Sequence, residues 1–299
     1  MFVRYDITHS TTYRYSMPVS FGEHRVMFRP RDSHDQRVLA TDLQVSPDAE
    51  IRLILDAHSN SVALVQPRVD STELRIVCTF TIEHARSQNL ELPLLPRAAL
   101  FPVAYTVDER FDLEPYIRPH HDDPRGELAA WAQQIVTAGG LVRTPRDALV
   151  EMNRVIREQF VYSARDEEGT QTPLETLASR RGSCRDFALL MIEATRRLGV
   201  AARFVSGYLY DPALDQDVDG DGRSDIVGAG ATHAWLQAYL PGAGWVPFDP
   251  TNNLLGGNEL IRVGVSRHPA QAAPISGTWF GTPGSYLGMT VDVQVRRRR

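Results

Sequence analysis

The sequence predicts an α+β protein with two domains: an all-β, sandwich-like N-terminal domain, and a C-terminal domain in which helices precede strands. The 299 residues exceed the commonest size of a single domain. Apolar and polar residues alternate with period two through residues 1–95, whereas residues 124–199 carry helix caps and helical spacing. We therefore assign residues 1–95 to a β-rich domain, 96–123 to a linker or covering arm, and 124–299 to the second domain.

The composition excludes several classes of partner. The chain is 42% hydrophobic and 23% charged with a net charge of -5, so no global basic surplus would attract nucleic acid. No segment approaches the roughly 20 apolar residues of a membrane span, and the N-terminus shows no signal-peptide pattern. We expect a cytoplasmic protein that binds neither nucleic acid nor membrane, with the basic run Arg296 to Arg299 as a solvated tail.

The N-terminal domain reads as successive strands. The clearest is ELRIVCTFTIEH, in which Leu74, Ile76, Cys78 and Phe80 fall on one face. Cys78 is therefore expected to be a small buried hydrophobe rather than a nucleophile. The chain has only two cysteines, which do not make a disulfide framework, so both are expected to be thiols.

The proline-containing stretch from about 91 to 124 interrupts all periodicity and marks the domain boundary. His120 and His121 lie there beside Asp122 and Asp123. Because adjacent residues do not easily converge on one ion, we do not expect a metal centre in this stretch.

Helices follow the boundary. Asp123 with Pro124 and Thr144 with Pro145 predict helix starts, and the helices extend to about 138 and 159. A capping box at Thr172 opens a third helix. The apolar residues after Cys184 recur at helical spacing up to Gly199, and strands follow as VAARFVSGYLY, ATHAWLQAYL and WVPFDPT.

Cys184 falls in the first turn of the predicted helix over 184–198. A thiol there faces unpaired backbone N–H groups and the positive end of the helix dipole, and both favour a thiolate. The alternative is a buried cysteine that only fills space. Its sequence neighbours are residue types that seldom surround a core residue: Gly182, Ser183, Arg185 and Asp186.

A thiolate nucleophile that attacks an acyl group needs a proton donor and a residue that orients the donor. His233 and Asp249 lie 16 residues apart on two strands joined by PGAG. A simple hairpin would pair residue 236 with Asp249 and place the two side chains on opposite faces. We therefore predict a one-residue bulge near Pro247 that brings Asp249 diagonal to His233 on one face. Taken alone, His233 would more often be a structural strand histidine, and it is the order of helix-start cysteine, strand histidine and neighbouring-strand aspartate that favours a catalytic role.

These blocks resemble a known family. GSCRDFA around Cys184, followed by ATHAWLQAYLPGAGWVPFDPTN, looks like the transglutaminase-like superfamily, and YRYSMPVSFGEHRVMFRPR resembles the β-rich region that precedes this domain in bacterial members. The resemblance implies a papain-like core with a catalytic triad. Cys184 would be the nucleophile, His233 the general acid and base, and Asp249 the residue that orients the imidazole. Trp235 and Trp245 would pack the site.

The activity implied is thiol-dependent acyl transfer at an amide bond, in a peptide or protein or in an amide side chain, through a thioester. The thioester can be resolved by water or by a second amine. Water is always present, whereas an amine would need its own binding site, so hydrolysis by a cysteine protease or amidase is favoured over transamidation. No cofactor is required. The Cys184 backbone N–H is a natural oxyanion donor, and the sequence identifies no second one. The alternative is a non-catalytic binding module that keeps the fold.

A second motif lies between the strand VSGYLY and His233. DVDGDGRSD resembles the first nine positions of a calcium loop, whose ligands would be Asp217, Asp219, Asp221, the carbonyl of Arg223, and Asp225. Two features depart from that pattern: position twelve is Gly228 instead of an acid, and no obvious helix flanks the loop. The alternative is an acidic, solvated surface loop.

Overall fold

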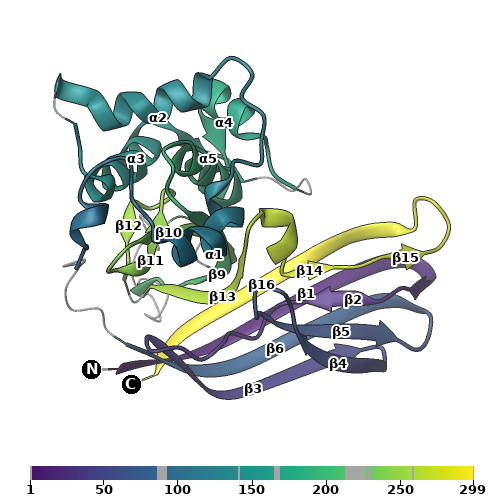
Figure 1. Cartoon of the computed structure of the whole chain (residues 1–299). Coiled ribbons are helices and arrows are strands. Elements are labelled where there is room, and N and C mark those ends of the chain that lie inside the picture. The colour runs from purple at the N-terminus through teal and green to yellow at the C-terminus, as the bar shows by residue number, and fades with distance from the viewer. Residues whose placement is uncertain are drawn as a thin grey trace, which may run out of the picture.

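The computed structural model describes residues 2–85, 93–140, 142–164, 169–212, 227, 230–257 and 259–298. A helical layer with its own sheet lies above a layer of long strands (Figure 1). This arrangement confirms the predicted α+β class, with a strand-rich N-terminal region before a helix-containing core. None of the helices in these ranges is long and apolar enough to cross a membrane.

Two antiparallel sheets form the lower layer. The first contains β1 (Phe2–Phe21), β6 (Ser71–Ala85) and β3 (Gln36–Ser46), and the second contains β2 (His24–Val26), β5 (Ser61–Pro67) and β4 (Ala49–Leu55). Alternate residues of β6 are buried as the sequence pattern predicts, and Cys78 is 2% exposed. Period-two patterning therefore predicted the buried face of β6 correctly.

The end of the chain returns to this layer. Strands β14 (Ile275–Ser276) and β15 (Trp279–Phe280) pair with β2 and β1, and β16 (Tyr286–Arg298) runs antiparallel along β1 (Figure 1). The expectation of a solvated tail at the basic run was wrong for its described part, because Arg296 pairs with Asp6 and Arg298 with Arg4. The arginine side chains are exposed, but their backbone completes the sheet that β1 would otherwise leave open.

The helical layer contains α2 (Glu127–Thr137), α3 (Pro145–Gln159), α4 (Pro173–Ser179) and α5 (Cys184–Arg197), with 3-10 turns η1 (Pro96–Ala98) and η2 (Ala138–Gly140). The stretch expected to be irregular also holds a helix, α1 (Val107–Ile117), which opens with a capping box between Thr106 and Glu109. The helix includes Pro115, and this proline hid it from the sequence analysis. Almost every residue of α5 is buried, so it is the central helix of the core.

The core sheet has the order β12-β11-β10-β9-β13. Its strands are β9 (Ala202–Leu209), β10 (Thr232–Leu240), β11 (Gly244–Asp249), β12 (Leu254–Leu255) and β13 (Leu260–Ser266), and the turn η4 (Pro269–Ala272) follows. A separate parallel pair joins β7 (Val161–Tyr162) to β8 (Arg181–Gly182), directly before α5. Helix α5 packs against β10 and β9, and this packing carries the start of the helix to the sheet.

A buried histidine joins the two layers. The His9 ring of β1 hydrogen-bonds the Tyr208 hydroxyl of β9 at 2.8 Å through Nδ1 and stacks on Phe28 at 3.8 Å between ring centroids. Burial lowers the pKa of His9 to about 3, so the ring is neutral at physiological pH and needs no counter-charge. Asn60 adds two further bonds to the backbone of Val265 in β13. The β layer is therefore a fixed support for the core sheet.

Candidate active site

Cys184 is the first residue of α5, as the sequence predicts. Ser183 precedes it in an extended conformation as the N-cap, and the Cys184 side chain lies at the edge of the core with the residue 8% exposed. The backbone N–H groups of a first helical turn have no carbonyl partners within the helix. The thiol therefore lies where the backbone N–H groups point out of the helix start, at the positive end of the helix dipole.

Asp186 holds the turn that carries Cys184, a role that the sequence analysis missed. Its fully buried carboxylate accepts the backbone N–H and the hydroxyl of Ser183 at 2.8 and 2.9 Å, and the backbone N–H of Gln171 at 2.7 Å. A side chain at Gly182 would place its Cβ 2.8 Å from the Asp186 Cβ, so only glycine fits there. The spacing S-C-R-D, an N-cap serine with an acid at N3, was the available signal.

His233 and Asp249 meet as a buried pair on neighbouring strands. His233 Nε2 donates to Asp249 Oδ2 at 2.8 Å, and neither side chain is exposed. A carboxylate only accepts hydrogen bonds, so Nε2 carries the proton. Nδ1 is buried and has no hydrogen-bond partner within the described part of the chain, and the Cys184 side chain lies close enough to raise the pKa of the ring.

The bulge predicted near Pro247 was wrong. The β10–β11 register is continuous from Leu240↔Gly244 to Leu236↔Phe248. Residues 241–243 form a three-residue loop, and this shifts the whole register by one position from the simple hairpin. Continued by one residue, it places Asp249 opposite Trp235, hence diagonal to His233 on the same face. The three-residue loop thus places Asp249 on the same face as His233, which is the effect that the bulge was expected to have.

The charges of the pair reinforce one another. Burial alone would lower the pKa of His233, but the charge of Asp249, its hydrogen bond and the Cys184 side chain outweigh burial and raise the pKa to about 10. Burial likewise tends to raise the pKa of Asp249, yet the imidazolium and the hydrogen bonds lower it below its ordinary value. At neutral pH, His233 is therefore an imidazolium held between an anionic carboxylate and the sulfur of Cys184.

Further hydrogen bonds fix the Asp249 carboxylate. Oδ1 accepts the backbone N–H of Thr251 at 2.9 Å, and Oδ2 accepts the Asn252 side-chain amide at 2.9 Å. Asn252 also accepts the Val227 N–H at 2.8 Å and donates to its carbonyl at 3.1 Å. The sequence analysis did not assign Asn252. An aspartate whose carboxylate bonds the backbone two residues on is the turn chemistry that D-P-T-N encodes.

The two tryptophans differ in role. Trp235 is 1% exposed and lies nearly parallel to the His233 ring, with ring centroids 6.0 Å apart. Gly207 faces His233 from β9, and a Cβ there would lie 2.0 Å from the Ile261 carbonyl and 2.8 Å from Trp235. Trp245 lies instead at the loop end of the hairpin, where the Arg203 guanidinium covers its ring at 4.1 Å. Trp235 therefore packs the site and Trp245 does not.

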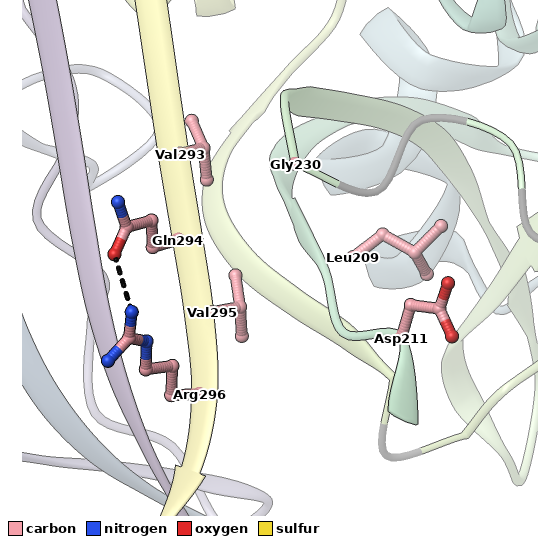
Figure 2. A pocket seen from close by; sticks show the side chains of 7 residues that line it. All are labelled: Leu209, Asp211, Gly230, Val293, Gln294, Val295 and Arg296. Atoms are coloured by element: carbon pink, nitrogen blue, oxygen red, sulfur yellow. Dashed lines mark hydrogen bonds between the residues drawn. The ribbon is translucent and has the colours of Figure 1, made fainter. Parts of the chain in front are cut away.

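Other candidate features lie apart from these residues. A cavity of about 140 Å³ lies between β16 and the ends of β9 and β10; its lining residues, which include Leu209, Gly230 and Val293, contain none of Cys184, His233 and Asp249 (Figure 2). The candidate calcium ligands Asp217, Asp219, Asp221, Arg223 and Asp225 fall outside the described residues. Within the described ranges, histidines, cysteines and acids form no metal-binding group of three or more.

His120 and His121 make structural contacts. Their backbone N–H groups donate to the buried carboxylate of Glu193, at 3.0 and 3.1 Å to Oε2. The His121 ring meets the His268 ring, with the two Nε2 atoms 3.3 Å apart. Glu193 also forms buried ion pairs with Arg196 and Arg197 of α5. Burial, together with the charge of Arg196, lowers the pKa of His120 and of His121. This cluster ties the C-terminal end of α5 to the segment after α1.

The three predicted residues thus share one small site. A sulfur lies at a helix start, beside an imidazolium that a buried carboxylate orients. Such an arrangement can supply an attacking thiolate and then return a proton from the ring to a leaving group.

Comparisons with known proteins agree with this geometry. The sequence model of the transglutaminase-like superfamily matches residues 129–250, and that of the bacterial transglutaminase-like N-terminal region matches residues 5–83. An uncharacterized protein of Mycobacterium leprae is 28% identical over 295 residues, which cover 97% of this chain and 98% of the relative. A protein-glutamine gamma-glutamyltransferase of Pseudomonas aeruginosa is 26% identical over 194 residues, 63% of this chain but only 27% of that protein.

One solved structure shares the fold across the whole chain. It is a "putative cysteine protease" from Cytophaga hutchinsonii, with a TM-score of 0.69 and 22% sequence identity, covering 99% of this chain and 91% of that one. At this identity the likeness concerns the fold.

Proposed function

The chain belongs to the transglutaminase-like superfamily, and on this premise we propose that it is a thiol-dependent acyl-transfer enzyme acting on amide bonds of peptides or proteins. The observation that carries the proposal is the buried His233–Asp249 pair at 2.8 Å next to Cys184 in the first turn of α5. Cys184 is assigned as nucleophile, His233 as general acid and base, and Asp249 as the residue that orients the ring. No cofactor is required for this chemistry.

The reaction proceeds in two steps. The Cys184 thiolate attacks the amide carbonyl and forms a C–S bond, while the carbonyl electrons move to oxygen. The intermediate collapses, the C–N bond breaks, and the His233 imidazolium gives its proton to the departing amine. The remaining thioester is cleaved by water, whose proton returns to His233. Asp249 keeps its charge throughout and stabilises the imidazolium.

The raised pKa of His233 sets the protonation state of its ring before the substrate binds. With a pKa of about 10, the ring already holds its proton at neutral pH, so it can give that proton to the departing amine. An imidazolium beside a cysteine at a helix start favours an attacking thiolate, and recognition alone does not need such an arrangement.

We favour hydrolysis over transamidation, because the described residues show no built site for a second amine. A direct test incubates the protein with glutamine-containing peptides, with and without a fluorescent primary amine. New N-termini or released ammonia without incorporation of the amine supports hydrolysis, whereas incorporation supports transamidation. Cys184→Ala is the matched control. If no product forms and iodoacetamide labels Cys184 no faster than a free thiol, the protein is a binding module instead.

Three further expectations remain predictions. A cytoplasmic location is tested by cell fractionation. The expectation that the protein binds neither nucleic acid nor membrane is tested by measuring its affinity for DNA, RNA and lipid vesicles. The proposed calcium loop is tested by melting the protein with added calcium and with a chelator, since a ligand that binds only the folded state raises the Tm. An unchanged Tm would count against that site.

A further inference from the structure

We propose that a cluster of arginines, where β9 and β13 of the core sheet lie next to the β layer, binds a small multivalent oxyanion of the phosphate class (Figure 1). Three guanidinium groups carry the proposal: those of Arg31, Arg203 and Arg267. Within the described ranges none of the three has a carboxylate partner, and all three residues are partly exposed, so a small ion can reach them. The cluster contains none of the proposed catalytic residues and does not rest on the proposed function.

Contacts through Tyr116 of α1 bring Arg203 and Arg267 to one place. The Arg203 guanidinium lies 4.1 Å from the centroid of the Trp245 ring, and the Tyr116 ring meets Trp245 edge-on with centroids 5.3 Å apart. The Arg196 guanidinium then joins two backbones, because it donates to the Tyr116 carbonyl at 3.0 Å and to the Arg267 carbonyl at 2.7 Å. Residues from β9, α1 and the end of β13 therefore converge here.

A histidine of the β layer lies against the same group. His58 Nδ1 and the Tyr116 hydroxyl are hydrogen-bonded at 3.0 Å. Burial lowers the pKa of the His58 ring, the charges of Arg203 and Arg267 lower it further, and Asp56 opposes them. Both guanidinium groups therefore lie within electrostatic reach of one ring.

Arg31 approaches from the segment between β2 and β3. The Gln36 side-chain amide donates to the Arg31 carbonyl at 3.4 Å and to the Arg262 carbonyl at 2.9 Å, which places Arg31 beside β13. Burial and the charge of Arg262 lower the pKa of Arg31. Burial and the charges of Arg262 and Arg31 likewise lower the pKa of Arg203 to about 9. The guanidinium groups are thus close enough to repel one another and remain charged at neutral pH.

The acids of the β layer at this junction are already paired. Asp56 accepts from Arg25 at 2.6 Å, and Asp35 lies 3.2 Å from Arg262. Asp56 also accepts the backbone N–H groups of His58 and Asn60, each at 2.9 Å. The positive charge of the other three arginines is therefore left without a matching carboxylate in the part of the chain that the structure describes.

Unused N–H donors indicate the chemistry of the ligand. Arg203 donates from Nε to Gln237 at 2.9 Å, and its two terminal nitrogens donate to no other described residue. Arg267 Nε is buried and has no partner among the described residues, and the Arg31 guanidinium makes no hydrogen bond to them. A planar guanidinium presents pairs of donors that match two oxygens of one phosphate, and such charge-assisted bonds are strong. A multivalent oxyanion would therefore use these donors and relieve the repulsion.

The test measures affinity by calorimetry and the Tm with inorganic phosphate, pyrophosphate and glycerol phosphate, against chloride at equal ionic strength. The wild type is compared with Arg31→Gln, Arg267→Gln and the control Arg296→Gln, at an exposed position of β16. At about 100 times its dissociation constant, phosphate should raise the wild-type Tm by about 4 °C. Loss of one charge-assisted contact should weaken binding by about 10- to 100-fold in both cluster variants and leave Arg296→Gln unchanged.

The comparison between variants decides the outcome, because phosphate also stabilises proteins by exclusion from their surface. Unchanged affinity in Arg31→Gln or Arg267→Gln, or no saturable binding by the wild type, overturns the proposal. If a substitution lowers the Tm in phosphate-free buffer, the affinity measured well below that Tm decides. Tighter binding of glycerol phosphate than of inorganic phosphate supports the site and identifies a phosphate ester as its ligand, and the reverse order identifies the free ion. None of these measurements needs turnover, so their failure would leave the proposed function untouched.

Discussion

Replacing Asp249 with asparagine should uncouple His233 from Cys184 while keeping the shape of the site. Asparagine has nearly the same volume and can still contact Asn252 and Thr251, but it has no charge. In the wild type, Asp249 and Cys184 raise the pKa of His233 from 6.5 to about 10 against the effect of burial. In Asp249→Asn, burial remains and the main opposing charge is gone, so the pKa of His233 should fall below its ordinary value.

The rise in pKa sets the size of the effect. A shift from 6.5 to about 10 corresponds to roughly 5 kcal/mol in favour of the imidazolium, part of which belongs to Cys184. Once the pKa of His233 lies below 7, each further unit makes the imidazolium at pH 7 about tenfold scarcer, so a fall to about two units below neutrality makes it about 10²-fold scarcer. Iodoacetamide labelling of Cys184 at pH 7 should slow by this factor, and kcat should fall by about 10²- to 10⁴-fold, since a neutral ring in the wrong tautomer cannot protonate the amine.

The assay is the rate of labelling against pH, read by mass spectrometry of the Cys184 peptide. Asp112→Asn, at an exposed position of α1, is the matched control. We expect wild type and Asp112→Asn to label rapidly down to mildly acidic pH, and Asp249→Asn to label only as pH rises toward that of an ordinary thiol. Superimposable profiles for wild type and Asp249→Asn would refute the reasoning, because Asp249 would then not control the charge of His233.

Further predictions follow from the same contacts. In the native protein, one equivalent of iodoacetamide at pH 7 should label Cys184 and leave Cys78 unlabelled, because burial raises the pKa of Cys78 to about 11; equal labelling of both by mass spectrometry would contradict this. Asn252→Ala removes one donor to the carboxylate and the link to the loop before β10, and should lower kcat by about 10- to 100-fold with little change in KM; an unchanged kcat would show that the other donor suffices. Gly207→Ala should destabilise the fold by about 1–3 kcal/mol, because its Cβ would lie 2.0 Å from a carbonyl of β13, and chemical denaturation measures this. Because the pKa of His233 is raised, its pairing contributes stability that is complete below pH 6.5 and is lost as pH rises through about 10. The difference in Tm between wild type and His233→Gln should therefore narrow between those pH values, and a constant difference would argue against the ion pair.

Local patterns in the sequence were sufficient for much of the site. A cysteine at a helix start follows from the cap, the helical spacing after it and the terminating glycine, and these are properties of neighbouring residues alone. The positions of His233 and Asp249 on joined strands follow in the same way from alternation and the PGAG turn. Cys78 was likewise placed in the core by period two, and the structure leaves it 2% exposed.

The register of the hairpin could not be obtained in this way. PGAG is compatible with loops of two or three residues, and one residue more or less moves Asp249 to the opposite face of the sheet. The structure has the three-residue loop and no bulge among the paired residues. In this register the Asp249 carboxylate reaches the His233 ring, and β10 packs against α5.

Local residue patterns specify the helix start at Cys184, the strands that carry His233 and Asp249, and the β-rich first region, because each depends on residues a few positions apart. The packing of the folded chain selects which distant groups join them. Asp186 receives the N–H of Gln171, 15 residues earlier; β7 brings Tyr162 to the approach of α5; and β16 returns to β1, 276 residues away at the Arg14–Thr290 bond. Such contacts follow from how the layers pack to bury their apolar faces, which no local spacing encodes.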